Sequence, residues 1–236
     1  MQQYFATSKK DKVLFLDKDD LNHIKNVMRM KEKTEIIVVH EDKSYICSLN
    51  SDFLSCTIKE VFKSEENKTP FVVYMPLLCE EKMSFILQHG TELGVTEFVV
   101  VMYNNCKYKL NNKDFDKKLK RWSKIVKEAS EQSYRIYKPT IDKIITIKDI
   151  KDTSNVKLVC SLDKTNVNKI NNVLTTKNSN DTISISFGPE GGLSEKEEDI
   201  LVSKGFKKVS LGNTVLRTET VPLFVASIRT YLNGCK

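Results

Sequence analysis

Residues 187–194, FGPEGGLS, and residues 211–220, LGNTVLRTET, decide the fold of this chain. Each stretch follows a short apolar run typical of a buried strand, carries glycine in a loop and leads into a helical pattern. Ser194 with Glu197 three residues later predicts a capping box at the start of one helix, and Pro222 suits the first turn of another. Parallel strands that end in such loops predict a ligand site at their carboxyl ends.

Common nucleotide-binding motifs do not explain these glycines. A phosphate-binding P-loop needs a lysine directly after its last glycine, and Leu193 follows Gly192 here. The dinucleotide fingerprint G-x-G-x-x-G is absent at this spacing. Two ordinary turns are the plain alternative, since glycine and proline punctuate any α/β fold. Glu190 in the first loop, with Arg217 and Glu219 in the second, favours a functional site.

The two stretches resemble motifs of a known family of enzymes. GPEGGLS-x-x-E and LG-x-x-x-LRTET are similar to the RsmE family, SPOUT-class methyltransferases, and so are TELGV at 91–95 and the segment from Glu128 to Pro139. His23 followed by Val27-Met28-Arg29 resembles a further motif near the amino terminus. The resemblance covers nearly the whole chain. It implies an S-adenosylmethionine-dependent enzyme that methylates N3 of a uridine in 16S ribosomal RNA of the small subunit.

The glycine loops are therefore the expected cofactor site. The residues expected to bind S-adenosylmethionine are Gly188, Glu190, Gly191, Leu211, Gly212, Leu216 and Thr218. Glycine lets the backbone approach the cofactor closely, and the two leucines sandwich the adenine ring, pack in the core, or do both. At three places the sequence departs from the family pattern. Val221-Pro222 follows RTET where alanine is usual, Asn213 and Thr214 stand where a basic residue is common, and the segment after TELGV reads Tyr103 to Tyr108.

Methylation of uridine N3 needs help at the acceptor. The N3 proton must be lost, and negative charge then develops on N3 and the flanking carbonyl oxygens. We expect Arg217 to stabilise that charge and Glu219 or Glu190 to help remove the proton. For Glu190 a structural role, capping N–H groups of its loop, is the favoured alternative.

A basic segment provides a candidate RNA surface. Between Lys107 and Lys127 there are nine lysines and arginines but only two acidic residues, within a formal net charge of +7. Apolar residues at helical spacing predict a long helix over residues 114–132. The residues expected to contact RNA are His23, Arg29, Lys113, Lys117, Lys120, Lys124, Gln132 and Arg135. Any single lysine is better explained as a solvated surface residue, whereas the cluster suits phosphate contact.

Composition indicates a cytoplasmic globular protein. The 236 residues are 40% hydrophobic, without a run long enough to span a membrane or a signal-peptide pattern at the start. Six scattered cysteines form no C-x-x-C pair, and the three histidines lie far apart. We therefore expect neither a metal site nor a disulfide framework.

The polar stretch from Lys63 to Pro70 divides the chain. Residues 1–69 show short β-type runs around one helix, predicted over 17–30, and suggest a small barrel; residues 70–236 alternate strands and helices, which predicts α/β structure with a mostly parallel sheet. The resemblance makes the first part a PUA-like RNA-binding domain. It makes the second a SPOUT methyltransferase domain with a deep C-terminal trefoil knot, in a homodimer.

Two alternatives stay open. One is a SPOUT enzyme that acts on another RNA or on a ribose 2′-hydroxyl. The other is a non-catalytic RNA-binding or ribosome-assembly factor, which the retention of both loops with Arg217 argues against. A barrel joined to a second domain gives a broad surface for folded RNA, so we expect assembled 30S particles to be the substrate.

Overall fold

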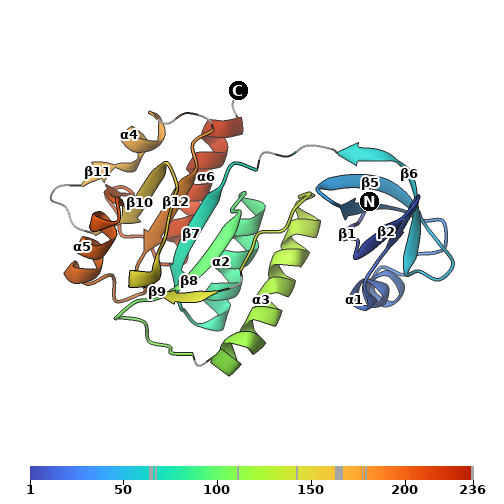
Figure 1. The fold of residues 1–236 in the computed structure, drawn as a ribbon, viewed down its shortest axis with the longest axis horizontal. Helices are drawn as coiled ribbons and strands as arrows, with labels where there is room; N and C mark the ends of the chain where they lie inside the picture. The colour runs from blue at the N-terminus through green and yellow to red at the C-terminus, as the bar shows by residue number, and fades with distance from the viewer. Residues whose placement is uncertain are drawn as a thin grey trace. The chain divides into compact units, whose positions relative to one another are not determined.

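Two compact units make up the structure (Figure 1). It is a computed structural model, and it describes residues 1–63, 66, 68–110, 112–141, 143–162, 167–176, 178 and 180–234. The first unit contains residues 1–67 and 127–138, and the second contains residues 68–126 and 139–236. Each unit has a hydrophobic core of its own, as independent domains do.

The first unit is built on one curled six-stranded sheet. Its strands are β1 (Gln3–Phe5), β2 (Ser8–Lys10), β3 (Val13–Phe15), β4 (Glu35–His40), β5 (Lys43–Leu49) and β6 (Ser55–Lys63). Their order in the sheet is β1-β4-β5-β6-β3-β2, in which only β1 and β4 pair in parallel. The β-type runs predicted at residues 13–16, 35–40, 45–49 and 55–61 correspond to β3, β4, β5 and β6. Strands β1 and β2 were not predicted, because neither is a continuous apolar run like the one at residues 13–16.

The helix of this unit is shorter than predicted. Helix α1 (Lys18–Asn22) begins after Asp17, whose side chain accepts a hydrogen bond from the backbone N–H of Asp20. It continues as a π-helical turn, η1 (His23–Val27). Arg29 has a φ of 50°, a left-handed conformation that ends the helix before the predicted boundary at residue 30.

The segment of residues 127–138 belongs to the first unit. The predicted division into residues 1–69 and 70–236 leaves it in the second. Ile136 packs with Phe5 and Val39 in a buried cluster, and Gln3 Nε2 donates a 2.7 Å hydrogen bond to the carbonyl of Arg135. These contacts join residues more than 90 positions apart, so a boundary drawn from local composition does not include them.

The second unit contains a seven-stranded parallel sheet and most of the helices. Its strands are β7 (Phe71–Pro76), β8 (Glu97–Met102), β9 (Ile144–Thr146), β10 (Val156–Cys160), β11 (Asn168–Lys169), β12 (Ile183–Phe187) and β13 (Lys207–Ser210). The sheet order is β11-β13-β10-β12-β7-β8-β9, with every pairing parallel. The helices are α2 (Glu80–Glu92), α3 (Asn112–Gln132), η2 (Ile147–Asp149), α4 (Ile170–Leu174), α5 (Glu195–Ser203) and α6 (Thr220–Gly234). The last turn of α3 belongs to the first unit.

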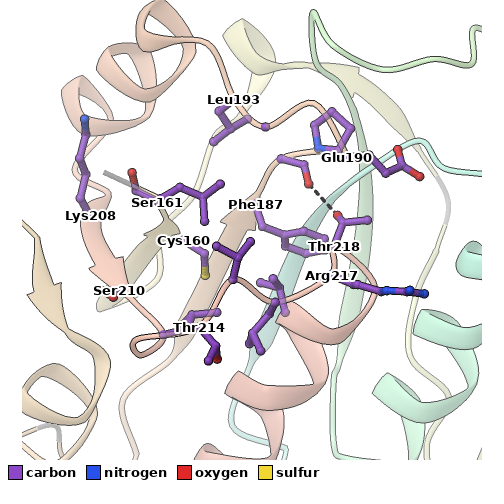
Figure 2. A pocket seen from close by; sticks show the side chains of 18 of the residues that line it. Cys160, Ser161, Phe187, Glu190, Leu193, Lys208, Ser210, Thr214, Arg217 and Thr218 are labelled. Atoms are coloured by element: carbon purple, nitrogen blue, oxygen red, sulfur yellow. Dashed lines mark hydrogen bonds between the residues drawn. The ribbon is translucent and has the colours of Figure 1, made fainter. Parts of the chain in front are cut away.

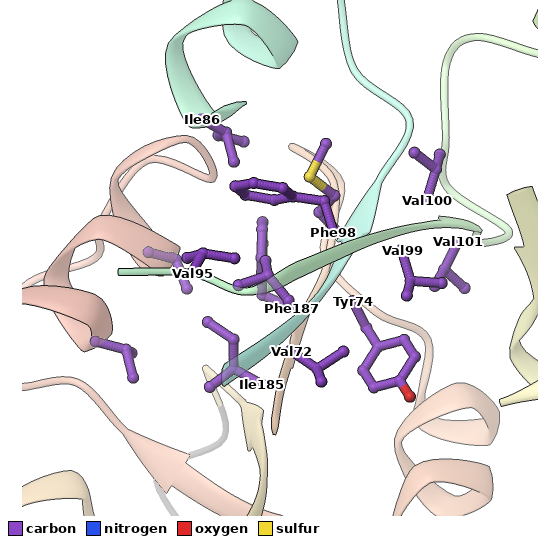
Figure 3. Packing of buried hydrophobic residues seen from close by; sticks show 14 of the residues in the cluster. Val72, Tyr74, Ile86, Val95, Phe98, Val99, Val100, Val101, Ile185 and Phe187 are labelled. Atoms are coloured by element: carbon purple, nitrogen blue, oxygen red, sulfur yellow. The ribbon is translucent and has the colours of Figure 1, made fainter. Parts of the chain in front are cut away.

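Large apolar side chains fill the second unit (Figure 3). Every residue of β7 is buried, and Phe98 and Phe187 on two other strands are almost fully enclosed. Parallel strands covered on both faces read as continuous apolar runs, and such runs predicted β7, β8, β10 and β12, whereas the strand expected near Ile141 lies at Ile144–Thr146. Gly90 in α2 lies so close to the Phe98 ring that an added Cβ would come within 2.9 Å of it. This glycine therefore allows helix and sheet to pack closely.

The strand order positions the two glycine loops. Strands β12 and β13 both pair with β10, which lies between them. The loops after β12 and β13 consequently flank the end of β10 at one edge of the sheet. The capping box of α5 is confirmed, since Glu197 Oε2 accepts from the backbone N–H and the hydroxyl of Ser194 at 2.9 and 2.7 Å. Across the described residues, no helix combines the length and apolarity that a membrane span requires.

Candidate active site

A pocket of about 940 Å³ opens where three strands end (Figure 2). Its walls are the loops that follow β10, β12 and β13, together with Lys82 from α2. The volume is at the upper end of the roughly 300–1,000 Å³ typical of small-molecule sites. The predicted residues Gly188, Glu190, Leu211, Gly212, Leu216, Arg217 and Thr218 all line it, whereas Gly191 and Glu219 do not.

Two contacts hold the glycine loops together. The hydroxyl of Thr218, in the second loop, donates a 2.7 Å hydrogen bond to the carbonyl of Gly188 in the first (Figure 2). Lys82 Nζ lies 2.9 Å from Glu190 Oε1 and 3.1 Å from Glu219 Oε2, so one lysine pairs with a carboxylate from each loop region. Thr218 is 8% exposed and its hydroxyl is committed to this hydrogen bond, so its predicted part in cofactor binding is to shape the pocket.

The first loop is braced from the end of β8. Asn105 Nδ2 donates to the carbonyls of Gly191 and Gly192, both at 3.1 Å. The backbone N–H of Asn104 donates to Glu197 Oε1 at 2.7 Å, which ties the same segment to the start of α5. Asn104 and Asn105 therefore support the wall of the pocket. Both belong to the segment from Tyr103 to Tyr108, where the sequence departs from the family pattern.

Gly188 and Gly212 serve different purposes. A Cβ at Gly188 would lie 2.6 Å from the backbone of Gly192 and Leu193, so this glycine permits the loop to fold on itself. The sequence predicted instead that it lets the cofactor approach. Gly212 has a φ of 135° and an added Cβ would meet nothing within 4 Å, so its requirement is conformational.

The inner surface of the pocket suits an adenine nucleoside. Leu211 and Leu216 pack against the hydrophobic core, which confirms one of the roles considered for them, and both also line the pocket, where contact with the adenine ring stays a prediction. In the described part of the chain, the backbone N–H groups of Val215 and Leu216 donate no hydrogen bond to a backbone carbonyl. Apolar walls with unpaired peptide groups are what a flat heterocycle with hydrogen-bonding edges requires. The residues present therefore fit S-adenosylmethionine.

The carboxylates near the rim are committed to Lys82. Burial acts to raise the pKa of Glu190, but the hydrogen bond and charge of Lys82 outweigh it and lower the pKa below its ordinary value. The hydrogen bond that Lys82 donates to Glu190 raises the pKa of Lys82 above its ordinary value. Glu190 pairs with Lys82 and its carboxylate also interacts with its own backbone N–H, so the ion pair adds to the loop-capping role favoured from the sequence. Glu219 lies outside the pocket lining and contacts the same lysine, which argues against its predicted role as a base.

Arg217 stands at the rim with its side chain exposed (Figure 2). It extends on the same side of the pocket as Glu190, with no ion pair to a described carboxylate. A guanidinium in this position is available to a substrate. The predicted catalytic position of Arg217 is therefore compatible with the geometry.

Two parts of the site were missed by the sequence reading. Lys82 is one of many lysines, and only its distance from Glu190 and Glu219 distinguishes it. Cys160 and Ser161 reach the pocket because β10 lies between β12 and β13, an order that no local pattern reveals. Burial raises the pKa of Cys160 to about 12, so this thiol stays neutral and contributes shape instead of a nucleophile.

The residues expected to bind RNA lie in different environments. Lys117, Lys120, Lys124, Gln132 and Arg29 are exposed on the surface, as RNA contact would require. His23 is partly buried, with Nδ1 3.0 Å from the hydroxyl of Tyr4. The side chain of Lys113 lies outside the described part of the chain.

Arg135 requires a correction. Its side chain is buried in the first unit, where Nε lies 3.2 Å from Glu66 Oε1 and the guanidinium stacks 4.4 Å from the centre of the Tyr137 ring. An arginine that is buried and paired with Glu66 inside its own unit does not reach a phosphate at the surface. The predicted RNA contact of Arg135 is therefore not supported.

Comparison with known proteins identifies the family. A model described as an RNA methyltransferase domain matches residues 65–230, and one described as an RNA methyltransferase PUA domain matches residues 16–60. The ribosomal RNA small subunit methyltransferase E of Bacillus subtilis (strain 168) is 32% identical over 248 residues, covering 98% of this chain and 96% of the relative. The chain belongs to the ribosomal RNA small subunit methyltransferase E family.

Solved structures agree with this assignment. The ribosomal RNA small subunit methyltransferase E from Neisseria gonorrhoeae, bound to S-adenosyl methionine, is 26% identical with a TM-score of 0.84, covering 98% of each chain. A putative methyltransferase from Legionella pneumophila, in complex with the cofactor SAM, has a TM-score of 0.88 at 20% identity, covering 97% of this chain and 96% of that one. The predicted fold is confirmed as a parallel α/β RNA methyltransferase domain preceded by a PUA-like domain. The SPOUT-type deep C-terminal trefoil knot stays a prediction from the resemblance.

Proposed function

We propose that this member of the family transfers the methyl group of S-adenosylmethionine to N3 of a uridine in small-subunit (16S) ribosomal RNA. The observation that carries the proposal is the pocket between two tied glycine loops with Arg217 at its rim. Membership of the small subunit methyltransferase E family supports the RNA class, and a related protein of the same fold binds S-adenosyl methionine.

The pocket would use Arg217 to activate the acceptor. When bound, S-adenosylmethionine supplies an electrophilic methyl group on a positively charged sulfur. Arg217 stabilises the negative charge that develops on N3 and its neighbouring carbonyl oxygens as the N3 proton leaves to water at the open rim. Attack by the N3 electron pair forms the nitrogen–carbon bond and breaks the carbon–sulfur bond, whose electrons stay on sulfur. The loops contribute mainly by fixing the geometry of this attack.

Lys82 has a positioning role in this mechanism. Its ion pairs with Glu190 and Glu219 fix the two loop regions relative to α2. We assign both carboxylates to this structural task instead of proton transfer. The chain then needs no side-chain base inside the pocket, because the rim is open to solvent at Arg217.

The substrate must present an accessible base. N3 lies on the Watson–Crick edge of uridine, so the target is unpaired or turned out of its stack. The exposed residues Arg29, Lys117, Lys120, Lys124 and Gln132 are the proposed RNA contacts. We further propose that the protein acts in the cytoplasm, as a homodimer, on assembled 30S particles.

Nucleoside mapping of ribosomal RNA from a deletion strain tests the function. We expect N3-methyluridine to disappear from the 16S RNA and to return with the wild-type gene but not with Arg217→Ala. Retention of N3-methyluridine in a cell without a second copy contradicts the proposal. Loss of a different modified nucleoside identifies another SPOUT reaction, and no detectable binding of S-adenosylmethionine identifies a non-catalytic RNA-binding factor.

A further inference from the structure

The span Lys107-Tyr108-Lys109, between β8 and α3, is exposed and is fixed at both ends. The side chain of Tyr108 is 47% exposed, and both lysines are exposed. Before the span, Cys106 is buried in the core of the second unit, and after it Leu110 packs against the same core. A stretch this short between two anchors samples few conformations, so it presents a largely preorganised surface.

The turn that leads into this span is bonded to the first glycine loop. Asn105 Nδ2 donates to the carbonyls of Gly191 and Gly192, both at 3.1 Å. The packing at this point is close, since an added Cβ at Gly191 would lie 3.1 Å from Cβ of Asn105. Lys107 follows two residues after Asn105, so the span begins beside the wall of the pocket.

The charge of Lys107 acts on the rim of the pocket. Burial raises the pKa of Glu190 and Lys82 lowers it, and the charge of Lys107 lowers it further. Lys107 therefore lies on the Glu190 side of the pocket. Figure 2 shows Arg217 on this side too, which is where the target base has to enter.

The side chains of the span differ from their basic neighbours in α3. Lys118 and Arg121 both pair with Glu80, at 2.8 and 3.2 Å, so their charges are already partly neutralised. In the described part of the chain, no carboxylate pairs with either lysine of the span, and no ring contact involves Tyr108. The span thus offers an aromatic face with a cation on each side.

We propose that this span binds the unpaired nucleotide next to the target uridine. Tyr108 stacks on its base, and Lys107 and Lys109 contact the phosphates on either side. Bases of single strands stack on aromatic side chains, while basic side chains neutralise the backbone that connects them. The inference rests on the proposed function, because it takes RNA as the substrate and places the target base at Arg217.

The composition of the span favours RNA over a protein partner. The cores of protein interfaces are enriched in tyrosine but depleted in lysine. Here a lysine stands on each side of the tyrosine, at the start of the segment from Lys107 to Lys127 with its nine basic and two acidic residues. A target uridine that presents its N3 is unpaired or turned out of its stack, so an adjacent base is open to stacking on the protein.

Binding of a short single strand tests the assignment. Filter binding measures the affinity of the full chain for an oligouridine of about ten nucleotides and for an RNA duplex of the same length, at several salt concentrations. The variants are Tyr108→Ala, Tyr108→Phe, Lys107→Gln and Lys109→Gln. The control is Tyr231→Ala, another exposed tyrosine of the second unit that does not line the pocket. Calorimetry with S-adenosylmethionine, thermal midpoints and self-association are measured on the same proteins.

We expect Tyr108→Ala to weaken binding of oligouridine about 5- to 150-fold, the range for loss of one stacked base. Tyr108→Phe keeps the ring and should stay within about twofold of wild type. Each lysine variant should lower the slope of log affinity against log salt by about 0.7, the value for one phosphate contact on a single strand. Affinity for the duplex and for S-adenosylmethionine should be unchanged in both Tyr108 variants, and Tyr231→Ala should change neither RNA affinity.

Several outcomes would overturn the assignment. One is wild-type affinity for oligouridine in Tyr108→Ala, and another is an equal loss for single strand and duplex. A loss of self-association in Tyr108→Ala with unchanged RNA affinity would show that the tyrosine contacts a second copy of the chain instead.

Crosslinking of the wild-type protein decides if Tyr108→Ala does not fold. Irradiation with oligouridine that contains 5-iodouridine should label Tyr108, as mapped by mass spectrometry of peptides. Labels confined to other residues would contradict the proposal. A protein that is labelled at Tyr108 but forms no N3-methyluridine in 16S RNA contradicts the proposed function and leaves this assignment standing.

Discussion

Gly212→Ala should weaken cofactor binding without disturbing the rest of the fold. The residue has a φ of 135°, and an alanine Cβ would meet nothing within 4 Å, so the cost is backbone strain and not a clash. A strained backbone of this kind costs roughly 1–3 kcal/mol. Gly212 is exposed and lines the pocket, so we expect the alanine variant to relieve the strain by leaving this loop conformation, which binding of the cofactor then has to restore. The dissociation constant should rise about 5- to 150-fold, since each 1.4 kcal/mol is a factor of ten.

Gly205→Ala is the matched control. Gly205 has a φ of 88° in the turn between α5 and β13, away from the pocket, and its Cβ would lie 3.9 Å from Lys157 Nζ. This variant should lower the thermal midpoint while leaving the dissociation constant unchanged. Calorimetric titration with S-adenosylmethionine and thermal unfolding measure the two quantities. Wild-type affinity in Gly212→Ala, or an equal loss of affinity in both variants, would refute the reasoning.

Three further changes have definite expected outcomes. Arg217→Ala should lower the single-turnover rate of methylation of 30S particles about 10²- to 10³-fold, with cofactor affinity within a few-fold of wild type. Loss of cofactor affinity with unchanged turnover at saturating cofactor would contradict the role of Arg217 in stabilising charge on the base. Lys82→Met should lower stability by about 1 kcal/mol and weaken cofactor binding a few-fold, because partly exposed ion pairs are weak. Lys82→Arg keeps the positive charge and should stay close to wild type. Equal behaviour of the two variants would show that the ion pairs do not hold the loops. Burial, opposed by Lys127, raises the pKa of Glu131 from 4.5 to about 8. Between these two pH values the folded state binds a proton that the unfolded state has lost. The free energy of unfolding of wild type, compared with that of Glu131→Gln, should therefore rise as the pH falls from about 8 towards 4.5. Urea unfolding at several pH values measures this difference, and a constant difference would show that the pKa is not raised.

Local patterns predicted much of the fold. The run Ile183–Phe187, the glycine loop after it and the Ser194–Glu197 capping box are adjacent in sequence, so periodicity and capping chemistry were sufficient to locate them. The same held for the long helix α3, whose apolar positions recur at helical spacing. Short strands such as β1 and β2, with three residues each, gave no comparable signal.

The walls of the pocket that come from elsewhere could not be predicted in this way. Ser161 joins the site because β10 pairs with both β12 and β13, and Lys82 joins it across 108 positions of sequence to Glu190. Arg135 was expected on the RNA surface because it lies in the family-like segment from Glu128 to Pro139, next to the basic segment. Its partner Glu66 is 69 positions away, and only the folded packing shows that the arginine is buried.

Methylation of isolated small subunits tests the central claim most directly. Subunits from a strain that lacks the gene are incubated with the purified protein and S-adenosylmethionine, and the nucleosides of the 16S RNA are separated and identified by mass spectrometry. We predict that N3-methyluridine appears at one position, and that it does not appear with Arg217→Ala. A wild-type protein that binds S-adenosylmethionine but yields no N3-methyluridine, or methylates a ribose 2′-hydroxyl instead, would contradict the claim.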